Sequence, residues 1–138
     1  MDHNELTIVE AAFKDWRDGT GYVSRLFAPH MTWEIVGRSA ASAKYANADE
    51  FITKVLEPFG RRFSTTDPFR PVTIRGIYAD GPTVIALWDG AGTTIAGTPY
   101  ENTYAWILTL KDRLIIHGVA FYDSVAFNEL WEIAPRDG

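Results

Sequence analysis

The sequence contains no cysteine, which excludes disulfide bonds, thiolate metal sites and a cysteine nucleophile. Histidine is scarce as well: His3, His30 and His117 share no ligand spacing with one another or with carboxylates, so we expect no metal site. The sequence also lacks a glycine-rich phosphate loop placed after a strand and a nucleophilic serine motif. We therefore expect no cofactor.

Positive charge is also limited. The chain has 13 Lys and Arg against 18 Asp and Glu, a net charge of -5, and no long basic run, which argues against nucleic-acid binding. It contains no apolar stretch of the roughly 18 residues that a membrane helix needs, and its start, MDHNE, lacks the cationic and apolar parts of a signal peptide. We expect a cytoplasmic protein that binds neither nucleic acid nor membrane.

Aromatic residues, by contrast, are abundant. They make up 14% of the 138 residues and include five Trp, within a composition that is 46% hydrophobic. A chain of this length can bury a substantial core without covalent cross-links, so we expect one domain spanning residues 1–138. The aromatic share suits the wall of a large internal cavity.

Periodicity and turn residues predict the order of the elements. Apolar residues at helical spacing predict a helix over 4–17, a short second helix over 22–28, and a third over 48–59 that Asn47 caps. Segment 38–46 reads as an irregular connection, and Asp123 or Ser124 can cap a last helical turn. Strands are expected at 31–36, 72–79, 83–88, 93–110 and 114–122, with turns at 80–82 and 89–92. This order predicts an α+β fold: a cone-shaped, curved antiparallel sheet packed on N-terminal helices.

The last two strands are the most informative part of the sequence. Side chains alternate between the faces of a strand, so Tyr100, Asn102, Tyr104 and Trp106 share one face, and His117, Val119, Phe121 and Asp123 share one face of the partner strand. We expect both groups to point the same way. A dry core disfavours unpaired Asn and His, and bulk water does not favour so many aromatics, so these side chains suit a ligand cavity.

Two segments resemble the nuclear transport factor two-like superfamily, in its SnoaL-like, ketosteroid-isomerase-like or polyketide-cyclase-like branch. One is residues 26–37, LFAPHMTWEIVG, and the other is the alternating Tyr100, Asn102, Tyr104 and Trp106 strand with the closing segment 113–123. The resemblance spans nearly the whole chain. It implies a cone whose interior holds a small molecule. The outer face of the curved sheet, rich in aromatics, suits a homodimer formed through that face.

The resemblance also implies site residues. Glu34 falls where ketosteroid isomerases carry the carboxylate that moves a proton, Tyr104 falls near an oxyanion donor, and His117 falls near pocket-lining residues. Two departures argue against particular activities of the family. The first helix has only Phe13 and Trp16 near the position of the isomerase tyrosine. Leu87 and Ala120 stand where limonene-epoxide-hydrolase-like members need an arginine and an aspartate.

Each candidate has a structural alternative. Glu34 can face a cavity as a general base, or point to water while Trp33 and Ile35 turn inward. His117 can shuttle a proton, or be a sheet histidine with one hydrogen-bond partner. Tyr104 and Asn102 can stabilise an oxyanion, or Tyr104 can pack in the core while Asn102 holds a loop. We expect substrate contacts from the following residues, of which Trp88 and Trp106 also suit a core or a dimer interface: Trp33, Trp88, Trp106, Val119, Phe121, Phe13 and Trp16.

These residues favour a cofactor-independent isomerase or cyclase. It would bind a hydrophobic, oxygenated small molecule and move a proton next to a carbonyl, with Glu34 as the base and Asn102, Tyr104 and His117 as donors or relay. The alternative is a non-catalytic ligand-binding or dimerisation module of the same fold.

Overall fold

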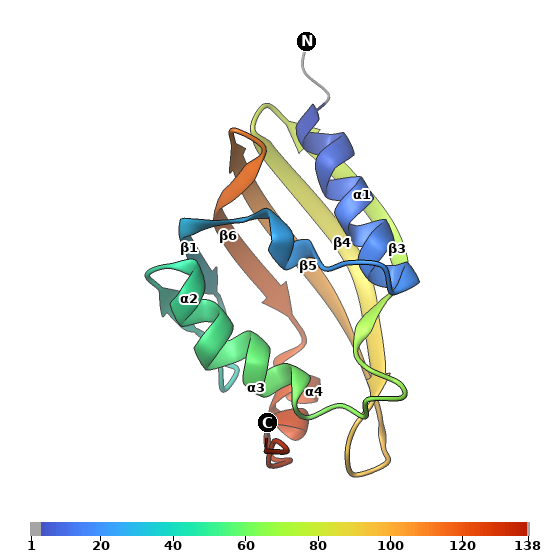
Figure 1. The fold of residues 1–138 in the computed structure, drawn as a ribbon. Helices are drawn as coiled ribbons and strands as arrows, with labels where there is room; N and C mark the ends of the chain where they lie inside the picture. The colour runs from blue at the N-terminus through green and yellow to red at the C-terminus, as the bar shows by residue number, and fades with distance from the viewer. Residues whose placement is uncertain (1–3, 138) are drawn as a thin grey trace.

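The computed structural model describes residues 4–137, whose six strands form one open, curved sheet in the order β2-β1-β6-β5-β4-β3 (Figure 1). Neighbouring strands are antiparallel except β1 and β6, which run parallel. The predicted α+β architecture and curved, mostly antiparallel sheet are therefore confirmed. The strands are β1 (Phe27–Ile35), β2 (Ala43–Tyr45), β3 (Arg70–Asp80), β4 (Thr83–Thr93), β5 (Pro99–Lys111) and β6 (Leu114–Tyr122).

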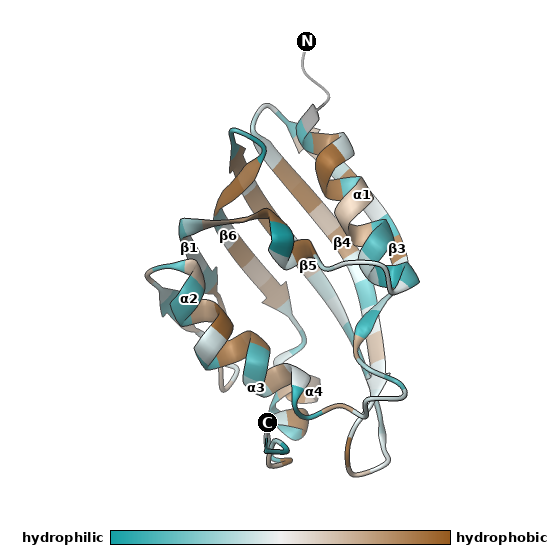
Figure 2. Cartoon of the chain, in the orientation of Figure 1, coloured by the Kyte–Doolittle hydropathy of each residue, from teal (hydrophilic) through white to brown (hydrophobic). Residues whose placement is uncertain are grey.

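The helices gather on one face of this sheet, as predicted (Figure 1). Helix α1 (Asn4–Asp18) packs on β3 and β4, the α2 (Ala48–Phe51) segment packs on β1, and α4 (Ser124–Trp131) packs on β5. The sheet therefore has an inner face, which the helices cover, and an outer face, which no helix of residues 4–137 covers. Figure 2 shows that apolar positions occur on both layers, the helices and the strands beneath them.

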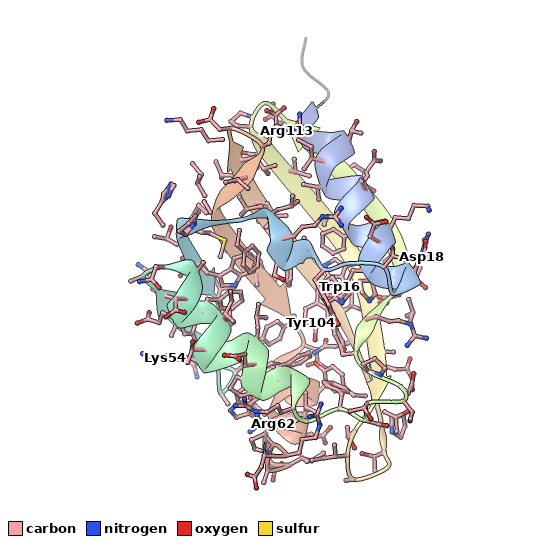
Figure 3. All side chains as sticks on the ribbon, viewed as in Figure 1. Trp16, Asp18, Lys54, Arg62, Tyr104 and Arg113 are labelled. Atoms are coloured by element: carbon pink, nitrogen blue, oxygen red, sulfur yellow. The ribbon has the colours of Figure 1, made fainter. Side chains whose placement is uncertain are left out.

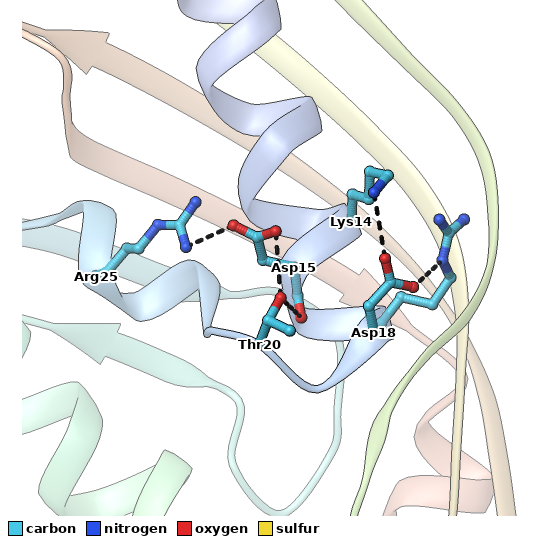
Figure 4. A network of polar contacts seen from close by, with 6 residues as sticks. Lys14, Asp15, Asp18, Thr20 and Arg25 are labelled. Carbon is cyan, nitrogen blue, oxygen red and sulfur yellow. Dashed lines mark hydrogen bonds and ion pairs between the residues drawn. The ribbon is translucent and has the colours of Figure 1, made fainter.

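The first helix was predicted to within one residue. Its buried side chains Val9, Ala12 and Phe13 form the apolar stripe that packs on the sheet, and Gly19, at φ +80, ends the helix. The Thr20 hydroxyl then donates to Asp15. The chain turns back after this glycine, and the contacts around its turn are drawn in Figure 4.

The prediction of a second helix was wrong. Only one 3-10 turn, η1 (Val23–Leu26), forms, and β1 begins directly after it at Phe27. The strand runs through Pro29, the residue directly after the predicted end of the second helix. Its pairing with β6 is irregular between Phe27 and Thr32, and a residue without an N–H is tolerated at such an irregularity.

The third helix follows the predicted path, with a wider turn in its middle. The Asn47 side chain accepts the N–H of Glu50, so the predicted cap is confirmed. The π-helical turn η2 (Ile52–Leu56) joins α2 to α3 (Glu57–Gly60), and the Glu57 N–H reaches back to the Ile52 carbonyl. Pro58 has no N–H for an α-helical hydrogen bond at this point, which explains the wider turn.

Two strand boundaries differ from the prediction. Residues 89–92 form no turn: β4 continues to Thr93, and the turn lies around Gly97, at φ +82. Gly90 and Gly92 lie within the strand, where phenylalanine residues pack so closely that there is no room for a larger side chain. A Cβ at Gly90 would overlap the Phe69 ring. The short strand β2 lies in the segment that was predicted to be irregular.

A β-bulge in the last hairpin decides which side chains face inward. The turn residues Asp112 and Arg113 both have positive φ, and Leu110 pairs with Ile115. The next pair is Thr109 with His117, so Ile116 is an extra residue. Since side chains alternate, this one insertion puts every later residue of β6 on the face opposite to the one a regular hairpin predicts.

Candidate functional site

A cavity of about 480 Å³ lies between the inner face of the sheet and the covering helices. This volume falls within the range of about 300–1,000 Å³ usual for small-molecule sites. In Figure 3, Tyr104 lies on the sheet and Trp16 lies at the end of α1 that faces it. The lining residues are Trp16, Tyr22, Val23, Ser24, Trp33, Ile35, Phe51, Val55, Leu56, Glu57, Phe59, Gly60, Arg61, Pro68, Phe69, Trp88, Tyr104, Trp106, Ala120, Tyr122, Phe127 and Arg136.

Tryptophan rings form the floor of the cavity. Trp106 meets Trp33 edge to face, with ring centroids 5.0 Å apart, and meets Trp88 in the same way at 5.2 Å. Trp88 stacks on Tyr104 at 4.4 Å, and Trp16 closes the cluster from α1. Such contacts fix the rings in place, so the floor is apolar and preformed.

Two indole N–H groups on this floor lack a hydrogen-bond partner. Trp33 Nε1 and Trp88 Nε1 are both buried, and no acceptor within residues 4–137 pairs with either. Most buried donors in folded proteins are paired, so each orphan N–H calls for an explanation. Both residues line the cavity, but the two nitrogen atoms have almost no accessible surface and so do not face its open space.

A chain of hydrogen bonds from Asn102 through Tyr100 holds the Tyr104 hydroxyl at the cavity wall. Asn102 Oδ1 accepts from the backbone N–H of Thr103 and of Asp123, which fixes the orientation of the amide. Its Nδ2 donates to the Asp123 carbonyl at 3.0 Å and to Tyr100 Oη at 2.8 Å. Tyr100 Oη also lies 2.8 Å from Tyr104 Oη.

The hydrogen bond between the two phenols can run in either direction. A phenol oxygen has two lone pairs, so Tyr100 Oη can accept from both Asn102 and Tyr104, or it can donate to Tyr104. Tyr104 lines the cavity, so its hydroxyl offers a ligand a proton when Tyr100 donates to it, and a lone pair when it donates to Tyr100. Burial raises the pKa of Tyr104 well above its ordinary value, and the neighbouring Tyr100 raises this pKa further. The Tyr104 side chain is therefore a neutral phenol.

Tyr122 is a second phenol at the cavity wall, on β6. Its hydroxyl lies 2.7 Å from Ser39 Oγ, and its ring stacks on Phe127 of α4 at 4.7 Å. Burial raises the pKa of Tyr122, although the hydrogen bond with Ser39 acts in the opposite direction. This side chain also stays protonated and helps to close the cavity near α4.

Charged side chains occur at the rim. Glu57 and Arg61 come from α3 and its end, and Arg136 comes from the C-terminal segment. The backbone N–H of Arg136 donates to the Arg61 carbonyl at 3.0 Å, which ties this segment to the end of α3. The cavity is thus apolar inside and charged at its edge.

Solved structures of other proteins share the overall fold of this chain. An NTF2-like protein from Burkholderia thailandensis is 21% identical and superposes with a TM-score of 0.70, over 92% of this chain and 96% of that one. A protein with a cystatin-like fold from Xanthomonas campestris is 16% identical, with a TM-score of 0.73 over 93% and 98% of the chains. TerC, co-crystallised with polyporic acid, is 18% identical, with a TM-score of 0.70 over 94% and 98%.

The chain has the NTF2-like fold. No protein-family model and no curated protein matches the sequence. Identities of this size establish the fold and leave the ligand and the reaction to be argued from the site itself.

Within this NTF2-like fold, five of the predicted site residues line one cavity. They come from four elements: Trp16 from α1, Trp33 from β1, Trp88 from β4, and Tyr104 and Trp106 from β5. Two more predicted residues are buried just behind this wall. Phe13 packs on Trp88 and Trp106, and Asn102 belongs to the hydrogen-bond network behind Tyr104.

The expectation that Glu34 and His117 share the cavity with Tyr104 was wrong. Trp33 and Ile35 point inward, so Glu34 between them lies on the outer face, in register with Val119. His117 also lies on the outer face, where its Nδ1 is 2.7 Å from Thr32 Oγ1. The physical reason is the parallel β1–β6 pairing together with the bulge at Ile116.

Val119 and Phe121 follow the same rule. They pair with Ile107 and Ala105 on the outer face, and Phe121 is 47% exposed. Neither lines the cavity, so their predicted role in substrate contact was wrong. In their place the inner face carries Ala120 and Tyr122.

Several lining residues were missed. Tyr122 was taken as the end of a strand, although its inward position follows once the bulge is known. Phe69 lies in a proline-containing loop, Arg61 directly follows α3, and Arg136 lies in the C-terminal segment after α4. Periodicity carries no information at such positions. Residues 4–137 contain no cluster of three or more His, Asp or Glu able to hold a metal ion. None of their helices has the length and apolarity needed to cross a membrane.

Proposed function

We propose that this chain is a SnoaL-like protein that binds a hydrophobic, planar, oxygenated small molecule in the inner-face cavity. The observation that supports this best is the Tyr104 hydroxyl, which lies at the wall of an aromatic cavity and is held there by a hydrogen bond with Tyr100, which in turn accepts from Asn102. The rest of the wall is largely aromatic. An apolar, aromatic site with a phenol hydroxyl at its wall suits a ring system bearing a carbonyl oxygen.

One structural neighbour supports this class of ligand. TerC was co-crystallised with polyporic acid, an oxygenated aromatic compound. The resemblance of the first strand and of β5 to SnoaL-like proteins supports the same proposal. Polyporic acid is therefore a reasonable first ligand to test, together with simpler aromatic ketones.

Prodan, a fluorescent naphthyl ketone, provides a direct test. Its emission depends on the polarity around its carbonyl and on hydrogen bonds to that oxygen. We expect the wild type to bind prodan, and Tyr104→Phe to weaken binding about two- to tenfold and to shift emission to the blue, because one buried hydrogen bond is lost. Glu34→Gln on the outer face is the matched control. Equal affinities and spectra for wild type and Tyr104→Phe would contradict the proposal.

A second candidate is cofactor-independent proton transfer, as in an isomerase or cyclase. A neutral phenol that donates to a carbonyl oxygen stabilises the enolate formed when a neighbouring C–H loses its proton. The one carboxylate among the lining residues is Glu57 at the rim, so Glu57, and not Glu34, is the base that this version requires.

Deuterium exchange separates the catalytic version from simple binding. With prodan in heavy water, an enzyme of this type exchanges the protons next to the ketone faster than buffer does, as followed by NMR. Tyr104→Phe and Glu57→Gln should each slow this exchange. Binding without enhanced exchange would leave the chain as a non-catalytic binding module.

We also propose that two copies associate through the outer face of the sheet. Ile85, Ile107, Val119 and Phe121 lie on neighbouring strands of this face, and Ile85 and Phe121 are more than one third exposed. A contiguous apolar patch of this kind is typical of an interface. Light scattering after gel filtration should report a dimer, and Phe121→Glu should convert it to a monomer. A monomeric wild type at high concentration would contradict this proposal.

A further inference from the structure

The rim of the cavity carries an excess of positive charge. Of the residues that line the cavity, Glu57, Arg61 and Arg136 are charged, which gives the rim a net charge of +1 (two positive groups and one negative). The whole chain has a net charge of -5. Positive charge at the mouth of an apolar cavity, on a chain that is negative as a whole, attracts an anionic ligand.

Neither arginine is neutralised by a carboxylate. Within residues 4–137, no Asp or Glu lies within ion-pair distance of Arg61 or Arg136. Glu57 stands four residues before Arg61, a spacing that permits a pair, and Glu50 and Lys54 form such a pair at 3.4 Å in the same helical segment. Arg61 therefore keeps its guanidinium donors available at the rim.

The structure holds the two arginines next to each other. The Arg136 backbone N–H donates to the Arg61 carbonyl at 3.0 Å. The buried Arg62 fixes the same segment from below: its Nε donates to the Ile133 carbonyl at 2.7 Å, and its guanidinium lies 3.9 Å from the centre of the Trp131 ring. Arg62 thus acts as an anchor. Arg136 Nε makes a long hydrogen bond of 3.5 Å to the Phe63 carbonyl, which leaves its two NH2 groups, together with the Arg61 guanidinium, for a ligand.

We infer that the ligand is an aromatic acid, with its rings in the cavity and its carboxylate between Arg61 and Arg136. This rests on the proposed binding function and narrows its ligand class. An anion is strongly disfavoured on the tryptophan floor, because it loses its hydration there and finds no counter-ion. At the rim the same anion keeps part of its hydration and gains guanidinium hydrogen bonds. The ligand therefore has one orientation, with the charged group outward and the oxygen acceptors toward Tyr104.

Two fluorescent probes test this inference. Anilinonaphthalene sulfonate is anionic, and N-phenylnaphthylamine has the same ring system without the charge. In the Arg61→Gln, Arg136→Gln double variant, we expect the affinity for the sulfonate to fall about tenfold and the affinity for the neutral probe to change less than about twofold. Replacing both arginines by lysine should restore part of the sulfonate affinity, and added salt should reduce the difference.

Arg113→Gln is the matched control, because Arg113 lies on the β5–β6 turn, away from the cavity. It should leave both affinities unchanged. Equal losses for both probes in the double variant, or no loss for either, would overturn the inference while leaving the cavity as a binding site. Failure of the wild type to bind either probe would overturn the binding function as well. Retained binding of the neutral probe also shows that the variant is folded.

An authentic carboxylate extends the same test. Naphthoic acid carries a charged carboxylate where naphthamide carries a neutral carboxamide of similar size. Each compound can be tested for competition with N-phenylnaphthylamine for the cavity. The wild type should prefer the acid, and the double variant should lose that preference. Preference for the amide in the wild type would contradict the assignment of a carboxylate to the rim.

Discussion

The two faces of the sheet are built from the same strands and serve different purposes. The inner face presents Trp33, Trp88, Tyr104 and Trp106 to a cavity, so the hydroxyl of Tyr104 lies where a small molecule can bind. The outer face lines no part of this cavity, and its His117 already pairs with Thr32. A polar group at a cavity wall is available to a ligand, whereas a satisfied pair outside the cavity is not.

This contrast shows how residue type alone can mislead. Glu34 and His117 are the usual acid–base residues, yet they alternate with cavity residues and face away from them. Tyr104 and the tryptophans, which were predicted as a hydrogen-bond donor and as substrate contacts, are the predicted residues that line the cavity. The face of the sheet on which a residue lies therefore predicts its access to the cavity better than its residue type does.

The largest effect should come from forcing an inner-face side chain out of place. Gly118 of β6 lies under Trp33, and a Cβ at this position would overlap the indole ring. Gly118→Val should destabilise the protein by about 3 kcal/mol and push Trp33 into the cavity. Urea unfolding measures the loss. Gly60→Ala, where a Cβ meets nothing within 4 Å, should change stability by less than about 1 kcal/mol.

The polar groups of the two faces should differ in their contribution to stability. Asn102 is buried and makes hydrogen bonds to two backbone N–H groups, one carbonyl and Tyr100, so Asn102→Ala should cost about 2 to 3 kcal/mol. His117→Ala on the outer face should cost about 0.5 kcal/mol. Equal costs in the same urea titration would mean that the two faces are not distinguished as described.

Alkaline pH should act on the inner face. Burial raises the native pKa of Tyr100, Tyr104 and Tyr122, so the native state keeps protons that the unfolded chain loses above its pKa of about 10. Their contribution is complete below pH 10 and falls as pH rises further. Phenolate absorbance should show Tyr100, Tyr104 and Tyr122 ionising only when the protein unfolds. Ionisation of all tyrosines in one early step would contradict their burial.

Acid pH should act on the outer face, with the smallest effect. Thr103 donates to Asp89 at 2.7 Å and Arg75 donates at 3.0 Å, and these contacts hold the pKa of Asp89 below its ordinary value. The resulting stability is present above about pH 4 and is lost as pH falls through the native pKa. Asp89→Asn should cost about 0.5 kcal/mol at pH 7 and nothing at lower pH, where both side chains are neutral. A cost that persists in acid would point to shape rather than charge.

Much of the fold could be predicted from the sequence because its signals are local. The apolar stripe of α1 and the Asn47 cap lie within a few residues of the elements they define. Gly90 and Gly92 were misread as a turn because what requires glycine there is a contact with phenylalanines from another part of the chain. Pairing across such distances leaves no local pattern.

The site was predictable in composition and not in orientation. The aromatic stripe of β5 does line a cavity, as predicted from Tyr104 and Trp106. The opposite strand was assigned to the wrong face because the bulge at Ile116 inserts one residue into an otherwise regular alternation. The rim arginines leave no periodic signal, so only the folded chain brings Arg61 and Arg136 together.

The indole N–H resonances offer the most direct test of the claim that ligands bind on the inner face. The chain has five Trp, and Trp131 does not line the cavity. Adding prodan to isotope-labelled protein should shift the N–H signals of Trp33, Trp88 and Trp106 and leave those of Trp131 and the His117 ring unchanged. A shifted His117 ring together with unchanged signals for Trp33, Trp88 and Trp106 would place the ligand on the outer face and contradict the account.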